Sequence, residues 1–188
     1  MLSEIQPSFL GDIREVPVET LGSLAGSGEQ TPEQVASATV LRKLAFAPRT
    51  RAELSSTLVE QGIPDQVVVS VLDRFAELGL IDDQAFAFLW VTSRHRVKGR
   101  ARRVLAHELR SKGVSAQEAE IALNSITTED EWERARLLVD RRLIAVLGLS
   151  TQAKGRRLIG YLARRGYPTH MAVSVVREVL SSTDHDTP

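Results

Sequence analysis

The chain has 188 residues with no net formal charge, 43% hydrophobic residues, 5% aromatic residues and no cysteine. The absence of Cys excludes a disulfide framework and a thiolate metal site, and the low aromatic content disfavours a β-sandwich. No apolar run approaches the roughly 20 residues of a membrane-spanning helix, and the N-terminus lacks the pattern of a signal peptide. We therefore expect a cytoplasmic protein with no membrane partner.

The charge is unevenly distributed along the chain. Residues 1–30 carry five Asp/Glu against one Arg, whereas residues 31–180 carry 23 Lys/Arg and 17 Asp/Glu. Residues 1–30 also lack a sustained hydrophobic period and end in a Gly/Ser-rich stretch, so we predict a disordered or loosely attached acidic extension. A short strand over 13–18 is the alternative. An acidic extension on a basic body indicates an anionic partner for the body.

Capping patterns and hydrophobic spacing predict three helices in residues 31–81. Thr31 and Gln34 form a capping-box pattern around Pro32, and Thr50 forms a second one with Glu53. A third helix begins at Pro64, and its apolar residues recur at helical spacing. The predicted helices cover about 31–47, 50–61 and 64–78.

Three further helices are predicted in residues 82–127. Asp82 and Asp83 are suited to cap the first of them, which carries an aromatic core run of Phe86, Phe88 and Trp90. This helix is expected to fade near His95 into a loop of alternating cations that ends at Gly99. A basic helix then covers 101–112, and a capping box over 115–118 opens a helix to about 126.

The last three helices are predicted in residues 128–180. A capping box over 128–131 starts a helix to about Leu147, and two helices over 151–165 and 168–180 follow, separated by Gly166. Residues 181–188 are predicted to form a disordered tail. No segment reads convincingly as a strand, so the sequence predicts nine helices and an all-α fold.

An internal repeat relates the three groups of helices. Gly62, Gly113 and Gly166 are separated by 51 and 53 residues, and apolar residues recur at fixed distances before and after each of them. We interpret each glycine as the left-handed cap of a middle helix. The predicted organisation is an elongated tandem array of three-helix repeats over 31–81, 82–127 and 128–180. Such an array suits a long, repetitive partner better than a small ligand.

The segment 94–112 is the most strongly charged part of the chain. It holds eight Lys/Arg against a single acid, Glu108, so salt bridges within the segment cannot neutralise it. We predict an electrostatic surface for phosphates or for the acidic face of a protein filament. Its members are Arg94, Arg96, Lys98, Arg100, Arg102, Arg103, Arg110 and Lys112.

The third repeat carries a second cationic group around Leu158 and Leu162. Here a binding surface and an ordinary solvated face are equally supported, and the group at 134–142 is a weaker candidate still. The second group consists of Lys154, Arg156, Arg157, Arg164 and Arg165.

Other candidate sites are better explained structurally. A base-stacking role for the aromatics near Trp90 is less favoured than a core role, and Asp82 and Asp83 lack a third metal ligand. His95 and His107 are expected at the surface. No nucleophile elbow, phosphate-binding loop or zinc-protease motif occurs, so we expect neither an enzyme nor a cofactor.

Several segments of this sequence resemble the RecX family of regulatory proteins. They are APRTRAEL (47–54), LGLIDD…FA…WV…SR (78–94), G…RR…EL…KGV (99–114) and LARRGY (162–167), of which the second is the most specific. The resemblance covers about 34–180 and does not include 1–30. It implies three tandem three-helix repeats and a non-enzymatic modulator that lies in the groove of the RecA–single-stranded-DNA filament and blocks its extension and activities.

The partners that we expect are therefore the RecA filament and, weakly and electrostatically, single-stranded DNA, with the protein acting as a monomer. Two other classes remain open. Residues 50–81 also read as a helix-turn-helix DNA-binding module, although its second helix carries only Arg74 as a cation. A helical-repeat scaffold for an acidic protein is the other alternative.

Overall fold

The computed structural model describes residues 30–185, and the side chains of 30–182. The chain divides into two units, Met1–Thr31 and Pro32–Pro188, and all the helices described below belong to the second. The predicted acidic extension and the alternative strand at 13–18 lie outside the described residues, apart from residue 30. So does the end of the predicted tail.

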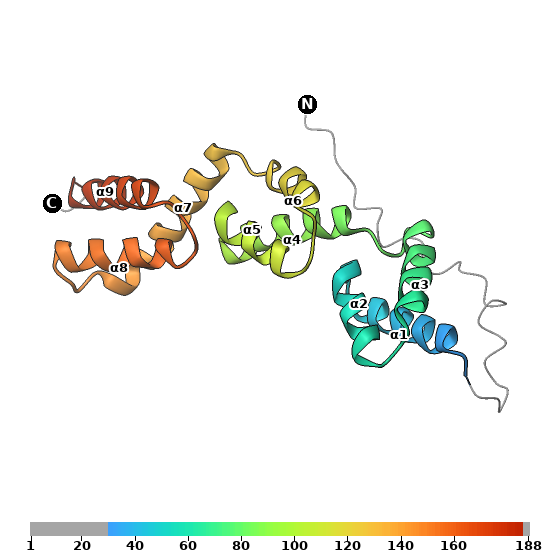
Figure 1. Ribbon diagram of the computed structural model, residues 1–188. Coiled ribbons are helices and arrows are strands. Elements are labelled where there is room, and N and C mark those ends of the chain that lie inside the picture. The colour runs from blue at the N-terminus through green and yellow to red at the C-terminus, as the bar shows by residue number, and fades with distance from the viewer. Residues whose placement is uncertain (1–29, 186–188) are drawn as a thin grey trace. The chain divides into compact units, whose positions relative to one another are not determined.

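The described part of the chain is entirely helical, as predicted, and contains nine α-helices and no strand (Figure 1). A single 3₁₀ turn, η4 (Ile144–Val146), follows the seventh helix. The helices are α1 (Pro32–Phe46), α2 (Arg51–Glu60), α3 (Asp65–Glu77), α4 (Asp83–Lys98), α5 (Arg102–Ser111), α6 (Ala116–Leu123), α7 (Thr128–Leu143), α8 (Thr151–Ala163) and α9 (Thr169–His185).

Each group of three consecutive helices encloses its own hydrophobic core. One cluster joins α1, α2 and α3, a second joins α4, α5 and α6, and a third joins α7, α8 and α9. The third cluster also takes in Ala101, which immediately precedes α5. The cores are therefore local to each repeat, with one small residue reaching across to the next.

The repeated apolar positions fill these cores. All twelve side chains that the glycine alignment brings into register are at most 8% exposed. This confirms that one set of core positions is used three times. The positions are Leu54, Leu105 and Leu158; Leu58, Leu109 and Leu162; Leu72, Leu123 and Val176; and Phe75, Ile126 and Val179.

The three aligned glycines end the middle helices in the same way. Gly62, Gly113 and Gly166 have φ of 76°, 77° and 92°, the left-handed region that side chains disfavour. The N–H of the residue after each glycine donates to the carbonyl five residues before it, with N···O distances of 3.1, 3.1 and 3.3 Å. This is the Schellman arrangement, and it confirms the predicted left-handed caps.

The region around Gly113 joins the first repeat to the second. The Thr50 hydroxyl, at the N-cap of α2, donates to the carbonyl of Lys112 at 2.6 Å, and the Lys112 ammonium pairs with Glu53 at 2.6 Å. The first N–H of α2, on Arg51, donates to a carboxylate oxygen of Asp83 at 2.8 Å. Burial raises the pKa of Asp83, although this hydrogen bond opposes the shift.

The second and third repeats are joined at the equivalent positions. The Ala101 N–H, at the N-cap of α5, donates to the Arg165 carbonyl at 2.9 Å. The Arg102 N–H donates to Glu131 of α7 at 2.9 Å, and Glu131 is only 9% exposed. In both joints, the donor groups at a helix N-terminus find their acceptors in the following repeat. The acceptors are a backbone carbonyl and a carboxylate.

Three expectations about the helices were wrong. The cations at 94, 96 and 98 do not form a loop: α4 continues to Lys98, because Arg and Lys are good helix formers and the left-handed Gly99 (φ 60°) provides the stop. The capping box of α7 is Thr127 with Asp130, one residue before the predicted one. The predicted tail at 181–188 is helical as far as His185.

Two side-chain expectations were also wrong. Phe88 is 51% exposed, because the core-facing side of α4 is formed by Phe86, Ala87 and Val91. His95 is 8% exposed rather than a surface residue, and its Nδ1 lies 2.9 Å from the Arg100 carbonyl. The imidazole thus supports the last turn of α4.

The aligned glycines allow a test of backbone conformation against packing. A Cβ on Gly62 would meet no atom within 4 Å, whereas a Cβ on Gly113 would lie 2.2 Å from that of Ala52. We expect Gly62→Ala to lower the free energy of unfolding by about 1 kcal/mol, because of the left-handed backbone alone. Gly113→Ala should cost a further ~1–3 kcal/mol of overpacking. Equal losses in urea unfolding would contradict this account of the joint.

The Glu53–Lys112 pair predicts a pH dependence of stability. Burial raises the pKa of Glu53, but the hydrogen bonds from Lys112 and the Thr50 N–H outweigh it and leave the pKa below its ordinary value of 4.5. A lowered folded-state pKa contributes stability above the ordinary value, and this is lost as the pH falls through the folded value. The stability difference between the native protein and Glu53→Gln should therefore shrink on acidification from neutral pH, measured by urea unfolding.

The matched control for this experiment is Glu60→Gln, at an exposed position near the end of the same helix. It should show little change in stability at either pH. A Glu53→Gln difference that stays constant on acidification would mean that the ion pair contributes nothing to the joint.

Candidate nucleic-acid interface

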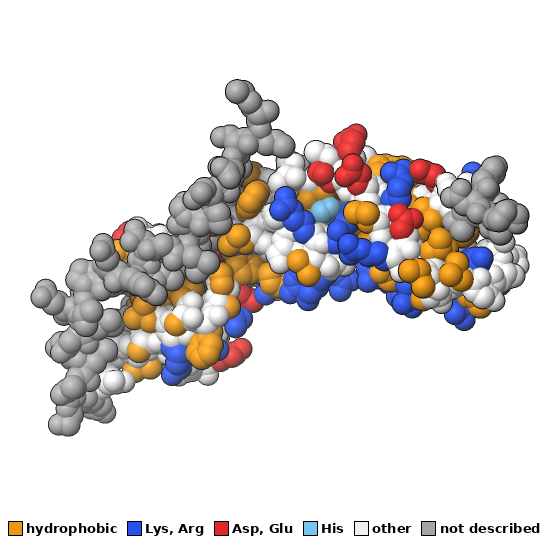
Figure 2. All heavy atoms as spheres, turned by 180° about the vertical axis from the view of Figure 1, so that it is seen from behind, with side chains coloured by type: hydrophobic (Ala, Val, Ile, Leu, Met, Phe, Trp, Pro, Cys, Tyr) orange, Lys and Arg blue, Asp and Glu red, His pale blue; other side chains and the backbone are white. Residues whose placement is uncertain are grey.

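Lys and Arg side chains gather on one face of the second unit, over its middle and C-terminal parts (Figure 2). The cations of 94–112 come from α4, from the turn after it and from α5 with its C-cap. They are not equivalent in the structure. Some are engaged by the protein itself and others extend into solvent.

Trp90 draws two of these cations into the protein. The Arg94 guanidinium lies 3.9 Å from the ring centroid and the Lys112 ammonium 4.4 Å from it, both within cation–π range. The indole N–H donates to Glu108 at 2.9 Å, and Glu108 also lies 3.7 Å from Arg100. Trp90 also stacks on Phe86, with ring centroids 5.6 Å apart, and packs against the second core, in agreement with the structural role predicted for it.

Arg102 also acts within the fold. Its guanidinium donates to the Ile126 carbonyl at 2.7 Å and to the Asn124 side chain at 3.1 Å. These acceptors follow α6, where helix carbonyls have no partner in the helix itself. The sequence placed Arg102 and Arg103 together off the buried stripe, but of the two only Arg103 is exposed.

The remaining cations of the segment extend into solvent. Lys98, Arg103 and Arg110 are exposed, and their side chains make no hydrogen bond or ion pair with another described residue. Arg96 is exposed too, but it helps to lower the pKa of Asp130, after the hydrogen bonds from Thr127. The positive charge available to a partner thus lies mainly at 98, 103 and 110.

The cations of the third repeat lie on α8 and directly after it. Arg156, Arg157 and Arg164 are exposed, and no ion pair within the described residues involves them. Lys154 is half-buried, and Arg165 lies over the Tyr161 ring at 3.8 Å. The two cationic groups meet at the second joint, where Arg100 donates to the Arg164 carbonyl at 3.4 Å.

The weaker candidates on α7 have different roles. Arg136 forms a two-pronged ion pair with Glu178 at 2.8 and 3.0 Å, and this hydrogen bond raises the pKa of Arg136. Arg134 donates to the Arg96 carbonyl. Arg142, in contrast, lies 5.6 Å from the Tyr161 ring centroid. Tyr161 was not among the candidates predicted from the sequence. Its spacing of four residues from both Arg157 and Arg165 nevertheless places all three near one side of a helix.

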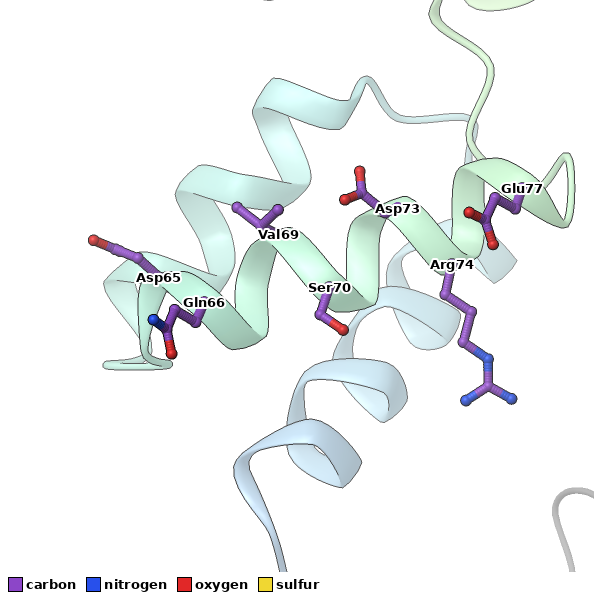
Figure 3. Close-up of a pocket in the computed structure, with 7 residues that line it drawn as sticks. All are labelled: Asp65, Gln66, Val69, Ser70, Asp73, Arg74 and Glu77. Carbon is purple, nitrogen blue, oxygen red and sulfur yellow. The ribbon is translucent and has the colours of Figure 1, made fainter.

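The helix that a helix-turn-helix protein would place in DNA carries the wrong charge here. Figure 3 shows seven residues along one side of α3, which include Asp65, Asp73 and Glu77 but a single cation, Arg74. Asp73 accepts a hydrogen bond from Arg51, and the other two acids are exposed. Phosphates would be repelled by this face.

An open groove lies between α4 and α7. Its volume is about 300 Å³, and it is bordered by Phe88 and Leu137 together with both acids and cations. The cations Arg96 and Arg134 are opposed by Asp130 and Glu133, so the groove does not select an anion. No cluster of potential metal ligands occurs among the described residues.

No helix among the described residues is long and apolar enough to cross a membrane.

Domain models of one protein family match the chain in three consecutive segments. Residues 36–75 match the first three-helix domain of RecX, residues 82–123 the second and residues 129–176 the third. Each match falls on one of the three groups of helices described above.

Proteins of the same name are similar over most of their length. The regulatory protein RecX of Streptomyces coelicolor is 47% identical over 170 residues, which are 89% of this chain and 90% of that protein. RecX of Thermobifida fusca is 47% identical over 82% of this chain and 85% of its own, and RecX of Mycolicibacterium smegmatis is 43% identical over 81% and 84%.

The fold is also similar to a solved structure. The crystal structure of RecX from Lactobacillus salivarius superposes with a TM-score of 0.70 at 20% identity, over 78% of this chain and 96% of that one. The three domain matches and the extended identity lead to one conclusion: this chain belongs to the RecX family of regulatory proteins.

Proposed function

We propose that this protein is a negative modulator of the RecA recombinase, acting in DNA repair, homologous recombination and the SOS response. It binds the RecA–single-stranded-DNA filament and reduces its extension, ATPase activity and strand exchange. Membership of the RecX family supports a regulatory role. The repeats that we assign to 31–81, 82–127 and 128–180 act as its binding units.

One observation carries the proposal furthest. Exposed cations without an ion pair among the described residues recur on α5 and α8, the middle helices of the second and third repeats. Arg103 and Arg110 lie on the first and Arg156 and Arg157 on the second. Positive charge presented by two successive repeats fits a polymeric anion better than a small one.

The first repeat contributes differently. Its middle helix, α2, carries Arg51 as its only cation, and that side chain pairs with Asp73 at 2.6 Å. The acidic face of α3 lies in the same repeat. We therefore assign DNA contacts to the second and third repeats, and protein contacts to the first.

The proposal predicts inhibition at low stoichiometry. Protein added below the RecA concentration should lower the DNA-dependent ATPase of RecA, because one bound molecule affects the growth of a whole filament. The measurement is a titration of ATP hydrolysis on single-stranded DNA. Unchanged ATPase at equimolar protein would exclude filament inhibition, and a duplex sequence preference that survives competitor DNA would instead support a helix-turn-helix regulator.

A charge-reversal pair tests the role of α5. Arg103→Glu with Arg110→Glu should weaken filament binding by at least about tenfold, because two positive charges become negative at exposed positions. Helix content should stay the same, since neither side chain packs in the core. Arg102 is left intact because it holds the end of α6.

The matched control reverses two exposed arginines outside both cationic groups, Arg42 in α1 and Arg177 in α9. It changes the net charge by the same amount and should retain binding. Equal weakening by both pairs would mean that only the net charge of the protein matters and that α5 is an ordinary solvated face.

A further inference from the structure

One side of α8 combines cations, an aromatic ring and a glycine. Arg157, Gly160, Tyr161 and Arg164 are spaced i, i+3, i+4 and i+7, so they lie along one face of the helix and its last turn. The core-facing residues of the same helix are Leu158 and Leu162, both fully buried. The face that carries Tyr161 borders this buried stripe, and Tyr161 itself is only partly buried.

Tyr161 is held in place by the core and by two arginines. Its ring is half-buried and packs on the edge of the third core. The Arg165 guanidinium lies 3.8 Å from the ring centroid and that of Arg142 lies 5.6 Å from it. A planar guanidinium on an aromatic ring forms a stack to which a nucleobase can be added.

The cations around this ring are not neutralised by neighbouring acids. None of the ion pairs among the described residues involves Arg142, Arg157, Arg164 or Arg165. Arg136, on the neighbouring helix α7, shows the contrast, because Glu178 engages it with both carboxylate oxygens. Unpaired arginines beside an aromatic ring provide the two groups that a nucleotide needs, one for phosphate and one for base.

Gly160 leaves the backbone of this face open to a partner. Glycine is unfavourable in a helix interior, and nothing in the fold requires it here. An added Cβ would only touch the flexible end of Arg164, at 3.4 Å. Glycine in such a position leaves room for a ligand to approach the backbone closely.

We propose that Arg157, Gly160, Tyr161, Arg164 and Arg165, the Tyr161 subsite, bind one unpaired nucleotide of single-stranded nucleic acid. The base extends the Tyr161–Arg165 stack, and the phosphate lies between Arg157 and Arg164 over Gly160. The subsite refines the DNA contact in the proposed function and rests on it. It adds a base-dependent contribution that salt screens less than phosphate contacts.

The direct test is the binding of the full chain to labelled oligodeoxythymidylate and to an abasic oligonucleotide of equal length and charge, followed by fluorescence anisotropy. The native protein should bind the base-bearing strand roughly fivefold or more tightly, the range expected for one stacked base. Equal affinity for the two strands would overturn the subsite. So would the absence of binding to either, which would leave an acidic protein as the ligand of these cations.

Arg165→Lys separates stacking from charge, because lysine keeps the charge and loses the planar group. It should remove most of the preference for the base-bearing strand and leave the salt dependence unchanged. Arg156→Lys, at an exposed position on the same helix without a ring contact, is the control and should bind like the native protein. A loss shared by both variants would contradict stacking at Tyr161.

A glycine pair tests the close approach independently. Gly160→Ala and Gly155→Ala should both stabilise α8, since neither added Cβ meets a clash. Only Gly160→Ala should weaken binding to the base-bearing strand, because Gly155 lies on another side of the helix. Undiminished binding by Gly160→Ala would overturn the approach of the phosphate to this backbone.

These measurements use no recombinase, so the two proposals can fail separately. Filament inhibition by a protein that binds both strands equally would remove the Tyr161 subsite alone. Base-dependent binding without any inhibition would remove the filament proposal and keep the subsite.

Discussion

The residues before Gly113 and Gly166, which are Lys112 and Arg165, each form backbone hydrogen bonds in their own repeat and to the preceding one. In the second repeat, Lys112 closes α5, and its carbonyl accepts the Thr50 hydroxyl of the first repeat. In the third repeat, the Arg165 carbonyl accepts the Ala101 N–H of the second. The glycine that follows must adopt a left-handed backbone to end its own helix. It must also lack a side chain. An added Cβ would lie less than 3 Å from Ala52 at Gly113, and less than 3 Å from Val104 at Gly166.

This constraint explains why the repeats keep their separate cores and still associate. Each core buries the same leucine columns, so the repeats depend little on one another for hydrophobic burial. The joints are instead built from helix termini, where unsatisfied N–H and carbonyl groups are already present. Asp83 and Glu131 complete them by accepting the first N–H of the preceding middle helix. The joints are consequently more polar than the cores.

The sequence was sufficient for the repeat and for most helices and caps, because these depend on local chemistry. The Thr50–Glu53 and Ser115–Glu118 capping boxes are present as predicted, and so are the three left-handed glycines. It was insufficient where a distant partner decides the outcome. Spacing alone gave no reason for His95 to be buried against the Arg100 carbonyl, nor for Phe88 to be exposed, because neither depends only on its own helix.

The candidate site shows the same difference between local patterns and distant partners. A count of charges treats the eight cations of 94–112 as one surface, but the structure separates them by what each side chain reaches. Arg94 and Lys112 flank Trp90, and Arg102 holds the end of α6. The residues in these contacts lie 4 to 24 positions apart in the sequence, and Lys112 lies 59 positions from its ion-pair partner Glu53. Apart from the i, i+4 pair of Trp90 and Arg94, no local pattern could identify these contacts.

The cations that take part in the fold also limit where a partner can bind. A joint that uses Lys112 for Glu53 and the Arg165 carbonyl for Ala101 leaves the far sides of α5 and α8 as the surfaces rich in free charge. Arg165 belongs to both groups, because its backbone closes the second joint and its guanidinium stacks on Tyr161. Movement at that joint would therefore displace the Tyr161 subsite directly, so nucleotide binding there and the stability of the joint are expected to be thermodynamically linked.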